Sequence, residues 1–240
     1  MEITRRSVTT MSLTAAAAAI MSSGHLPGAA AAVFPRVKPH WHPGQVVTGT
    51  GVRAVAFTFD DGPRNGATQA ILAFLAERQL KATFCMIGSA VATSPAVARQ
   101  VHAAGMEIAN HTCDHSMSLG QESHAAIERD IRRTQDVIHS EVGVIPRVFR
   151  APGGASTPRI LDVLRNDFHH MMPLGWSVES RDWSRPGTEQ IVTTVTTEVS
   201  SGAIIVFHDL NGCSAETLAA LPVVYDHLVR RGHTFTQVVG

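Results

Sequence analysis

The chain has 240 residues, which is enough for one sizeable hydrophobic core and fits a single domain better than two. Apolar residues make up 44% and charged residues 17%, a composition that is typical of a packed globular domain and argues against a disordered chain. Lys plus Arg and Asp plus Glu are both 20, so the formal net charge is zero. The sequence has no basic segment that would favour a nucleic-acid partner, and it has no acidic tail. A neutral partner such as a glycan fits better.

The first 32 residues differ from the rest of the chain. Arg5 and Arg6 precede a weakly apolar, Ala-rich stretch (11–21), and small residues follow at 29–32. This order predicts a signal peptide over residues 1–32, and the paired arginines favour the twin-arginine route. An Ala-rich disordered tail is the alternative. The apolar stretch is too short to stay in a bilayer, so we expect a secreted monomer without stable membrane insertion.

Residues 33–52 are rich in Pro, His and Gly and are expected to form an arm that leads into a domain at 53–240. In that domain short apolar runs alternate with segments of helical periodicity. The predicted strands are 54–59, 83–87, 106–109, 148–150, 171–176, 203–208 and 234–238. The predicted helices are 68–79, 94–105, 121–142, 157–166, 188–200 and 215–231. This alternation predicts an α/β fold with a mainly parallel sheet and helices outside it.

Reactive side chains follow the predicted strands at their carboxyl ends. They are Asp60, Asp61, His111, Arg150, Asp182 and His208. In a parallel barrel the loops after the strands form one face and hold the active site, so we expect these side chains around one mouth.

Two of these segments suggest a metal site. Asp60 and Asp61 follow an apolar strand, and two adjacent carboxylates repel each other unless a cation lies beside them. His111 and His115 are four residues apart, so their imidazoles can converge on one ion. Two histidines and one carboxylate are a common ligand set for zinc, although a polar turn and a chance histidine pair explain each segment separately.

Three further segments are weak signals when each is taken alone. Arg150 precedes Ala-Pro-Gly-Gly. The segment is either an ordinary turn or a binding element, in which the Arg150 guanidinium bonds to a carboxylate and the glycines expose backbone N–H groups to a ligand. The segment 176–183 places acidic residues beside an aromatic side chain. His208 ends a buried strand, where a histidine is more often structural than catalytic.

In this order, the motifs Thr-Phe-Asp-Asp-Gly, His-Thr-x-x-His, Arg-x-Pro-x-Gly, acid-x-x-Asp-Trp and a final His-Asp resemble the polysaccharide deacetylase family, carbohydrate esterase family 4. The resemblance runs from about Arg53 to the C-terminus. It implies a distorted, incomplete (β/α) barrel and a metal-dependent hydrolase that removes acetyl groups from polysaccharide or oligosaccharide of the chitin or peptidoglycan type.

The resemblance also implies a role for each matching residue. Asp60 is expected to be the general base, held ionised by Arg150. Asp61, His111 and His115 are expected to bind a divalent metal, most often zinc, with cobalt as an alternative.

On the acid side of the reaction, His208 is expected to protonate the leaving atom, with Asp182 orienting it and raising its pKa. The backbone N–H of Gly153 is expected to stabilise the oxyanion. Trp183 and Val206 are expected to line the pocket for the acetyl methyl.

The chain departs from the family pattern at three positions. Gly153 stands where an aromatic residue is usual, so one wall of the sugar groove is expected to be missing. Glu179 replaces an aspartate, which keeps the charge and lengthens the side chain. Cys113 lies in the metal loop, and a bridge between it and Cys213 is possible on sequence alone.

Three functions remain open. The first is hydrolysis of N-acetyl groups, and the second is hydrolysis of O-acetyl esters on acetylxylan by the same site. The third is a non-catalytic carbohydrate-binding barrel, which predicts that at least one of the key residues is missing. We favour an enzyme, because the residues expected to act as base, metal ligands and acid are all present. They are Asp60, Asp61, His111, His115 and His208.

Overall fold

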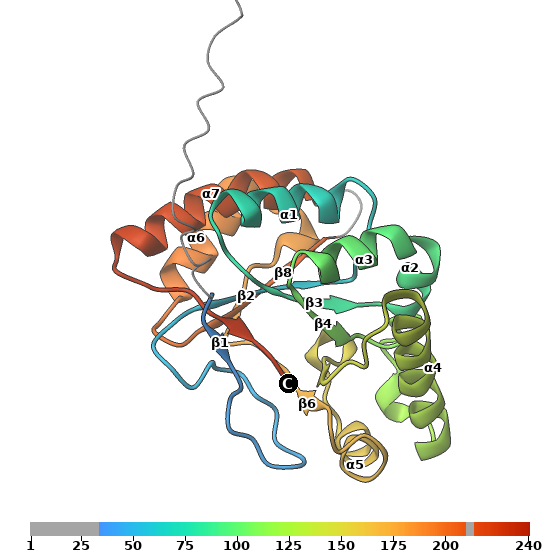
Figure 1. Ribbon diagram of the computed structural model, residues 1–240. Helices are drawn as coiled ribbons and strands as arrows, with labels where there is room; N and C mark the ends of the chain where they lie inside the picture. The colour runs from blue at the N-terminus through green and yellow to red at the C-terminus, as the bar shows by residue number, and fades with distance from the viewer. Residues whose placement is uncertain (1–33, 210–213) are drawn as a thin grey trace, which may run out of the picture. The chain divides into compact units, whose positions relative to one another are not determined.

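The computed structural model describes residues 34–209 and 214–240, which belong to one compact unit, Phe34–Gly240 (Figure 1). The predicted signal peptide, 1–32, and Cys213 lie outside the described residues. The described strands are β1 (Arg36–Val37), β2 (Ala56–Asp60), β3 (Thr83–Met86), β4 (Glu107–Asn110), β5 (Val148–Phe149), β6 (Met172–Pro173), β7 (Val178–Glu179), β8 (Ile204–His208) and β9 (Gln237–Val238). The described helices are α1 (Ala67–Glu77), α2 (Gly88–Thr93), α3 (Pro95–Ala103), α4 (His124–Val142), α5 (Pro158–Asp167), α6 (Thr188–Glu198) and α7 (Ser214–Arg230), with 3-10 turns at Leu119–Gln121, Pro152–Gly154 and Asp182–Ser184.

Seven strands form one parallel sheet in the order β6-β5-β4-β3-β2-β8-β7. No pairing between the end strands β6 and β7 is found in the described part of the chain, so the sheet does not close into a full barrel. In the central register Asp60 lies opposite both Cys85 and His208, which places these residues at one level of the sheet. The predicted fold class, an incomplete (β/α) barrel, is confirmed.

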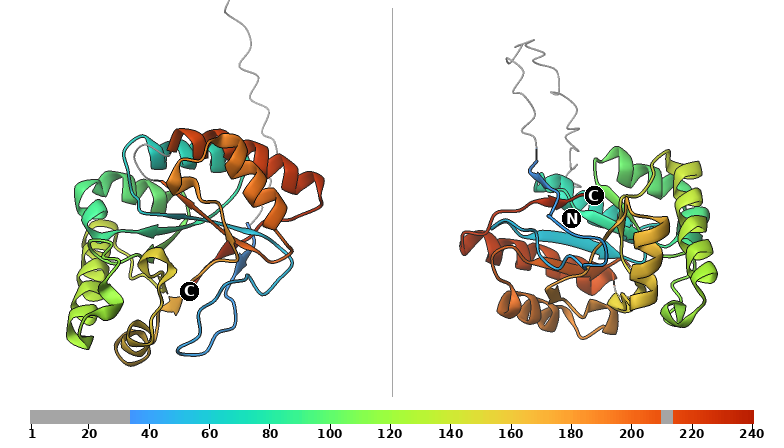
Figure 2. Two further views of the ribbon diagram at one scale, coloured as in Figure 1. Left: turned by 180° about the vertical axis from the view of Figure 1, so that it is seen from behind. Right: turned by 90° about the horizontal axis from the view of Figure 1, so that it is seen from below.

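The helices pack side by side along the outside of this sheet. α7 lies between α1 and α6, and α4 contacts both α3 and α5. Figures 1 and 2 show α1, α6 and α7 over one part of the sheet and α2, α3 and α4 over another. All five residues of β2 are buried, as expected for a central strand whose two faces are both covered.

The longest helix, α4, begins and ends at residues that favour helix termini. The side chain of Ser123 accepts a hydrogen bond from the N–H of Ala126 at the N-terminus, and Gly143 ends the helix with φ 84°. Ile127, Ile131, Thr134 and Ile138 are buried on one face, as their spacing predicts. Each buried isoleucine stabilises the fold by about 1.5–3 kcal/mol relative to an exposed one.

The N-terminal arm takes part in the barrel. The Val47 N–H donates to Pro173 O (2.8 Å) and the Gly175 N–H donates to Val47 O (2.7 Å), so the arm continues the sheet beside β6. Three residues later the Thr50 N–H donates to Gly202 O (2.9 Å), just before β8. The arm therefore bridges the side of the barrel that the main sheet leaves open.

Several predicted elements differ from the structure in length or number. The strand predicted at 171–176 is only Met172–Pro173, because the residues after it pair with the arm rather than with another strand. The short helix α2 precedes α3 and was not predicted, nor were the two-residue strands β1 and β7. The two-residue strands β5, β6 and β9 lie in apolar runs that mark them, whereas β1 and β7 lie among polar residues and proline and have no such run.

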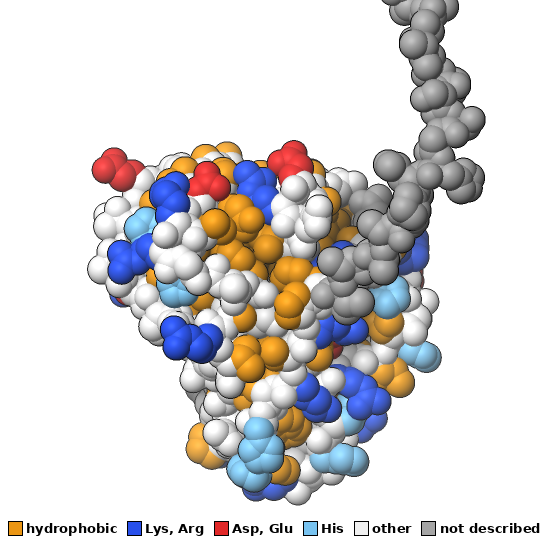
Figure 3. Space-filling view, turned by 60° about the vertical axis from the view of Figure 1, so that its left-hand side comes forward, with side chains coloured by type: hydrophobic (Ala, Val, Ile, Leu, Met, Phe, Trp, Pro, Cys, Tyr) orange, Lys and Arg blue, Asp and Glu red, His pale blue; other side chains and the backbone are white. Residues whose placement is uncertain are grey.

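Cys85 and Cys113 are both buried, and the described residues contain no disulfide bond. A bridge from Cys113 to Cys213 lies outside the described residues. On the face in Figure 3, basic side chains are scattered among apolar and uncharged surface rather than gathered into one patch. Within 34–209 and 214–240, no helix has both the length and the apolar character needed to cross a bilayer.

Candidate active site

A cavity of about 560 Å³ opens at the carboxyl ends of the parallel strands. The residues that line it come from the ends of β2, β7 and β8 and from the loops that follow β4, β5, β6 and β7. They are Asp60, Asp61, His111, His115, Met117, Gly153, Trp176, Glu179, Trp183 and His208. The structure thus brings most of the predicted site residues to one mouth, as the strand-exit pattern predicts.

Arg150 holds Asp60 inside the protein. Its Nη1 atom donates to Asp60 Oδ1 at 2.7 Å and to Thr58 Oγ1 at 2.8 Å, and its Nη2 atom donates to Gly175 O at 2.8 Å. The Arg150 side chain is fully buried. Burial raises the pKa of Asp60, but the charges of Arg150 and of nearby histidines outweigh burial, so the pKa lies below its usual value.

Asp61, His111 and His115 form a group that could hold a metal ion, because one potential ligand atom from each lies within 4.8 Å of the others. The Nε2 atoms of His111 and His115 lie 3.4 and 3.2 Å from Asp61 Oδ1. That oxygen is buried and makes no hydrogen bond to any described residue. A buried carboxylate oxygen that faces two imidazole nitrogens without a hydrogen bond is suited to a cation, so the residues present fit a metal ion.

The ligand group is oriented by the backbone and by neighbouring acceptors. The Nδ1 atom of His111 lies 2.7 Å from Arg150 O, which leaves Nε2 to face Asp61. Asp61 and His115 have left-handed backbone conformations, with φ 77° and 55°. Such conformations are costly for residues other than glycine and persist where the surrounding structure imposes them, as at binding sites.

His208 is paired with a buried carboxylate. Its Nδ1 atom lies 2.7 Å from Asp182 Oδ1, and the other oxygen, Oδ2, accepts the backbone N–H of His208 at 2.9 Å. The hydroxyls of Ser180 and Thr217 also donate to Asp182. Burial lowers the pKa of His208, but the hydrogen bond and charge of Asp182 outweigh burial and raise it to about 9.

Part of the cavity lining is uncharged and includes Met117, Gly153, Trp176 and Trp183. Trp183 is 53% exposed, and its indole N–H donates to Glu179 Oε1 at 3.0 Å. Gly153 lines the cavity. Val206 is buried in β8 and, among the residues that the structure describes, is not part of the lining.

Sequence reasoning missed two lining residues, Met117 and Trp176. Trp176 lies at the end of a predicted strand, so the strand-exit pattern contained a signal for it. Met117 lies within the loop after His115, where no spacing or residue type marks it.

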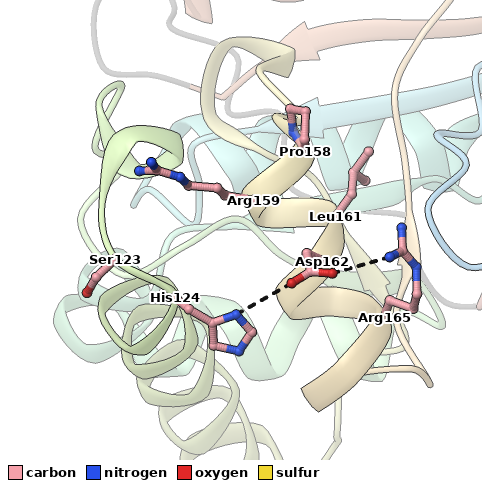
Figure 4. A pocket seen from close by; sticks show the side chains of 7 residues that line it. All are labelled: Ser123, His124, Pro158, Arg159, Leu161, Asp162 and Arg165. Atoms are coloured by element: carbon pink, nitrogen blue, oxygen red, sulfur yellow. Dashed lines mark hydrogen bonds and ion pairs between the residues drawn. The ribbon is translucent and has the colours of Figure 1, made fainter.

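A second and larger cavity, of about 830 Å³, lies where α4 begins beside α5 (Figure 4). Three of its charged or titratable side chains take part in ion pairs, whereas Arg159 donates to the backbone carbonyls of Gln121 and Glu122. His124 Nδ1 lies 3.8 Å from Asp162, His124 Nε2 lies 2.7 Å from Asp167, and Arg165 Nη1 lies 3.2 Å from Asp162. These side chains are 31–50% exposed, so their charges are partly solvated as well as paired.

Known proteins share both sequence and fold with this chain. The sequence model of the family described as "Polysaccharide deacetylase" matches residues 48–171. A Bacillus cereus protein named peptidoglycan-N-acetylglucosamine deacetylase is 33% identical over 186 residues, covering 78% of this chain and 86% of that protein. A Rhizobium leguminosarum bv. trifolii protein named chitooligosaccharide deacetylase is 36% identical, covering 77% and 89%.

A solved structure agrees with these sequence relatives. The family 4 carbohydrate esterase from Streptomyces lividans, in complex with acetate, is 32% identical to this chain and superposes with a TM-score of 0.67, covering 76% of this chain and 91% of that one. The region matched by the family's sequence model, residues 48–171, includes the Asp-Asp turn, the histidine pair and the Arg150 motif. The chain therefore belongs to the polysaccharide deacetylase family.

Proposed function

We propose that the chain is a metal-dependent hydrolase that removes acetyl groups from N-acetylglucosamine units of a polysaccharide or oligosaccharide. One arrangement carries the proposal: a single cavity holds Asp60, bonded to buried Arg150, and His208, bonded to buried Asp182, beside the potential metal ligands. These partners lower the pKa of Asp60 and raise the pKa of His208 to about 9. A base that stays ionised and an acid that stays protonated at the same pH are what amide hydrolysis requires. The names of the relatives support the substrate class.

Asp60 acts as the general base and accepts a proton from the attacking water. Its carboxylate is buried, yet the charge of Arg150 keeps it ionised near neutral pH. The hydrogen bonds that Arg150 donates to Asp60, to Thr58 and to two backbone carbonyls fix the carboxylate in one orientation. Precise orientation of a catalytic group lowers the entropy cost of the reaction.

Asp61, His111 and His115 would hold the metal ion, with zinc favoured and cobalt as an alternative. When bound, a divalent ion in such a site acidifies water and polarises the acetyl carbonyl. The pKa of His115 is lowered by burial and by the neighbouring His111, so its imidazole is neutral and has a lone pair for a ligand bond.

His208 acts as the general acid and protonates the leaving nitrogen. Its Nδ1 atom is bonded to Asp182, so the proton that is transferred is the one on Nε2. Gly153 would donate its backbone N–H to the oxyanion, and Trp183 would form a wall of the acetyl pocket. Val206 is buried in β8 and pairs with Glu179, so it would support the pocket rather than line it.

The same residues can hydrolyse an O-acetyl ester, which is the second candidate function. An amide nitrogen must be protonated to leave, whereas an alkoxide leaves more readily without an acid. Acetate release should be measured side by side on N-acetyl chitooligosaccharide, peptidoglycan and acetylxylan, with zinc or cobalt present. If only acetylxylan releases acetate, the ester function replaces the amide function. If no substrate releases acetate, both are wrong.

Export is part of the proposal and is supported by the sequence of residues 1–32. Arg5, Arg6 and the Ala-rich stretch match the order of a twin-arginine signal. Fractionation of cells that produce the full chain, with N-terminal sequencing of the exported product, tests this. A product that keeps residue 1 and stays in the cytoplasm would contradict it.

A further inference from the structure

The loop after Pro152 exposes bare backbone to the cavity. Gly153 and Gly154 both have left-handed conformations, with φ 56° and 70°. A Cβ atom on Gly153 would lie 2.5 Å from Met117 Cε and 3.4 Å from Met117 Sδ. The Met117 side chain therefore occupies the space that a side chain at position 153 would need.

Met117 is unusual among the described methionines. Met86, Met106, Met171 and Met172 are all at most 6% exposed, whereas Met117 is 64% exposed. Two of the exposed large hydrophobic side chains line the catalytic cavity, namely Met117 and Trp183. Apolar side chains that are exposed and line a cavity are available for van der Waals contact with a ligand bound there.

We propose that Met117 is a specificity-determining residue that supplies the cavity wall above Gly153 and contacts the sugar ring next to the acetyl group. This inference builds on the proposed function. The occupant is the apolar C–H face of a pyranose ring, because the thioether offers van der Waals contact and no strong hydrogen bond. Met117 is distant in sequence from the Arg150 motif, and only the fold brings the two loops together.

The thioether makes this wall adaptable. Methionine is unbranched and has three side-chain torsions, so it can move aside for rings with different substituents. The wall acts on binding of the sugar rather than on the chemistry at the acetyl carbon. Removing it should therefore weaken substrate binding more than it slows turnover.

The first test compares Met117→Ala with Met117→Leu, which keeps the apolar volume. On N-acetyl chitooligosaccharide, Met117→Ala should raise KM about 5- to 30-fold, and this rise should exceed any fall in kcat, while Met117→Leu should stay within about threefold of wild type. Val229→Ala removes another exposed apolar side chain, near the C-terminal end of α7, and should change neither constant. A KM for Met117→Ala within twofold of wild type overturns the proposal.

A binding measurement separates this inference from the proposed function. Calorimetry with an N-acetylglucosamine oligomer should give a Kd for Asp60→Asn that rises about 5- to 30-fold when Met117→Ala is added. If wild type releases no acetate but binding of the oligomer depends on Met117, the proposed function is wrong, whereas the proposed contact between Met117 and the sugar stands. If the oligomer does not bind, or binds equally well to both variants, the proposed contact between Met117 and the sugar is wrong.

Discussion

Arg150 Nη1 lies 2.7 Å from Asp60 Oδ1, and both side chains are buried at the carboxyl end of the sheet. The guanidinium also bonds to Thr58 and to the carbonyls of Leu174 and Gly175. The carbonyl of Gly175 belongs to the segment whose N–H bonds to Val47 in the arm. The orientation of the proposed base therefore depends on contacts that extend from β2 to the arm.

Replacing Arg150 with methionine should damage both activity and stability. Asp60 would be left buried without its charge partner, so its pKa should rise and kcat/KM should fall by at least 100-fold. The free energy of unfolding should fall by about 3–5 kcal/mol, as is typical when one partner of a buried ion pair is removed. Urea denaturation and steady-state kinetics check the two effects. Full activity in Arg150→Met would show that the pair does not hold the base.

Asp182→Asn should move the alkaline limb of the pH–rate profile to lower pH. His208 must be protonated to act as an acid, and Asp182 raises the pKa of His208 to about 9 from its usual 6.5. Activity in wild type should fall as the pH rises through about 9, and in Asp182→Asn it should fall at lower pH. An unchanged alkaline limb would contradict the acid assignment.

The same pair predicts a pH dependence of stability. Because the pKa of His208 is raised on folding, its contribution to stability is complete below pH 6.5 and is lost as the pH rises through about 9. Urea denaturation of wild type between these pH values should show a declining free energy of unfolding. The decline should be weaker in Asp182→Asn.

His115→Ala should lower the metal content of the purified protein. The imidazole of His115 is one of three potential ligands, and removing one ligand commonly weakens metal binding by orders of magnitude. The matched control is His124→Ala, since His124 pairs with Asp167 beside the second cavity and should leave metal content unchanged. Elemental analysis after dialysis measures both. Equal metal content in His115→Ala and wild type would remove His115 from the ligand set.

A chain that begins at residue 53 should be less stable than one that begins at residue 34. The shorter chain lacks the arm, whose hydrogen bonds reach Pro173, Gly175 and Gly202 and whose Val47 is buried in the barrel interior. A lower melting temperature and a lower kcat are expected, because Gly175 also orients Arg150. Equal melting temperatures would mean that the catalytic domain begins near residue 53, as the sequence predicts.

Local sequence patterns predicted the parallel sheet and the cavity well. The apolar run before Asp60 and the stripe of Ile127, Ile131 and Ile138 determine a strand and a helix by themselves. A parallel sheet places the carboxyl ends of its strands at one edge, so the sequence alone could group the reactive residues into one site.

Contacts between segments far apart in the chain could not be predicted in this way. The pairing of Val47 with Leu174 and the position of Met117 over Gly153 depend on tertiary packing, which leaves no periodic signal in either segment. The full burial of Arg150 also has no signal in the sequence, because an arginine is usually at least partly exposed.

The central claim is that Asp60 is the base of a metal-dependent deacetylase. The most direct test measures acetate release from N-acetyl chitooligosaccharide and metal content on the same samples of wild type and Asp60→Asn. We predict acetate release by wild type, and in Asp60→Asn unchanged metal content with kcat lowered by at least 100-fold. Substantial turnover in Asp60→Asn, or no acetate release by metal-loaded wild type, would contradict the account.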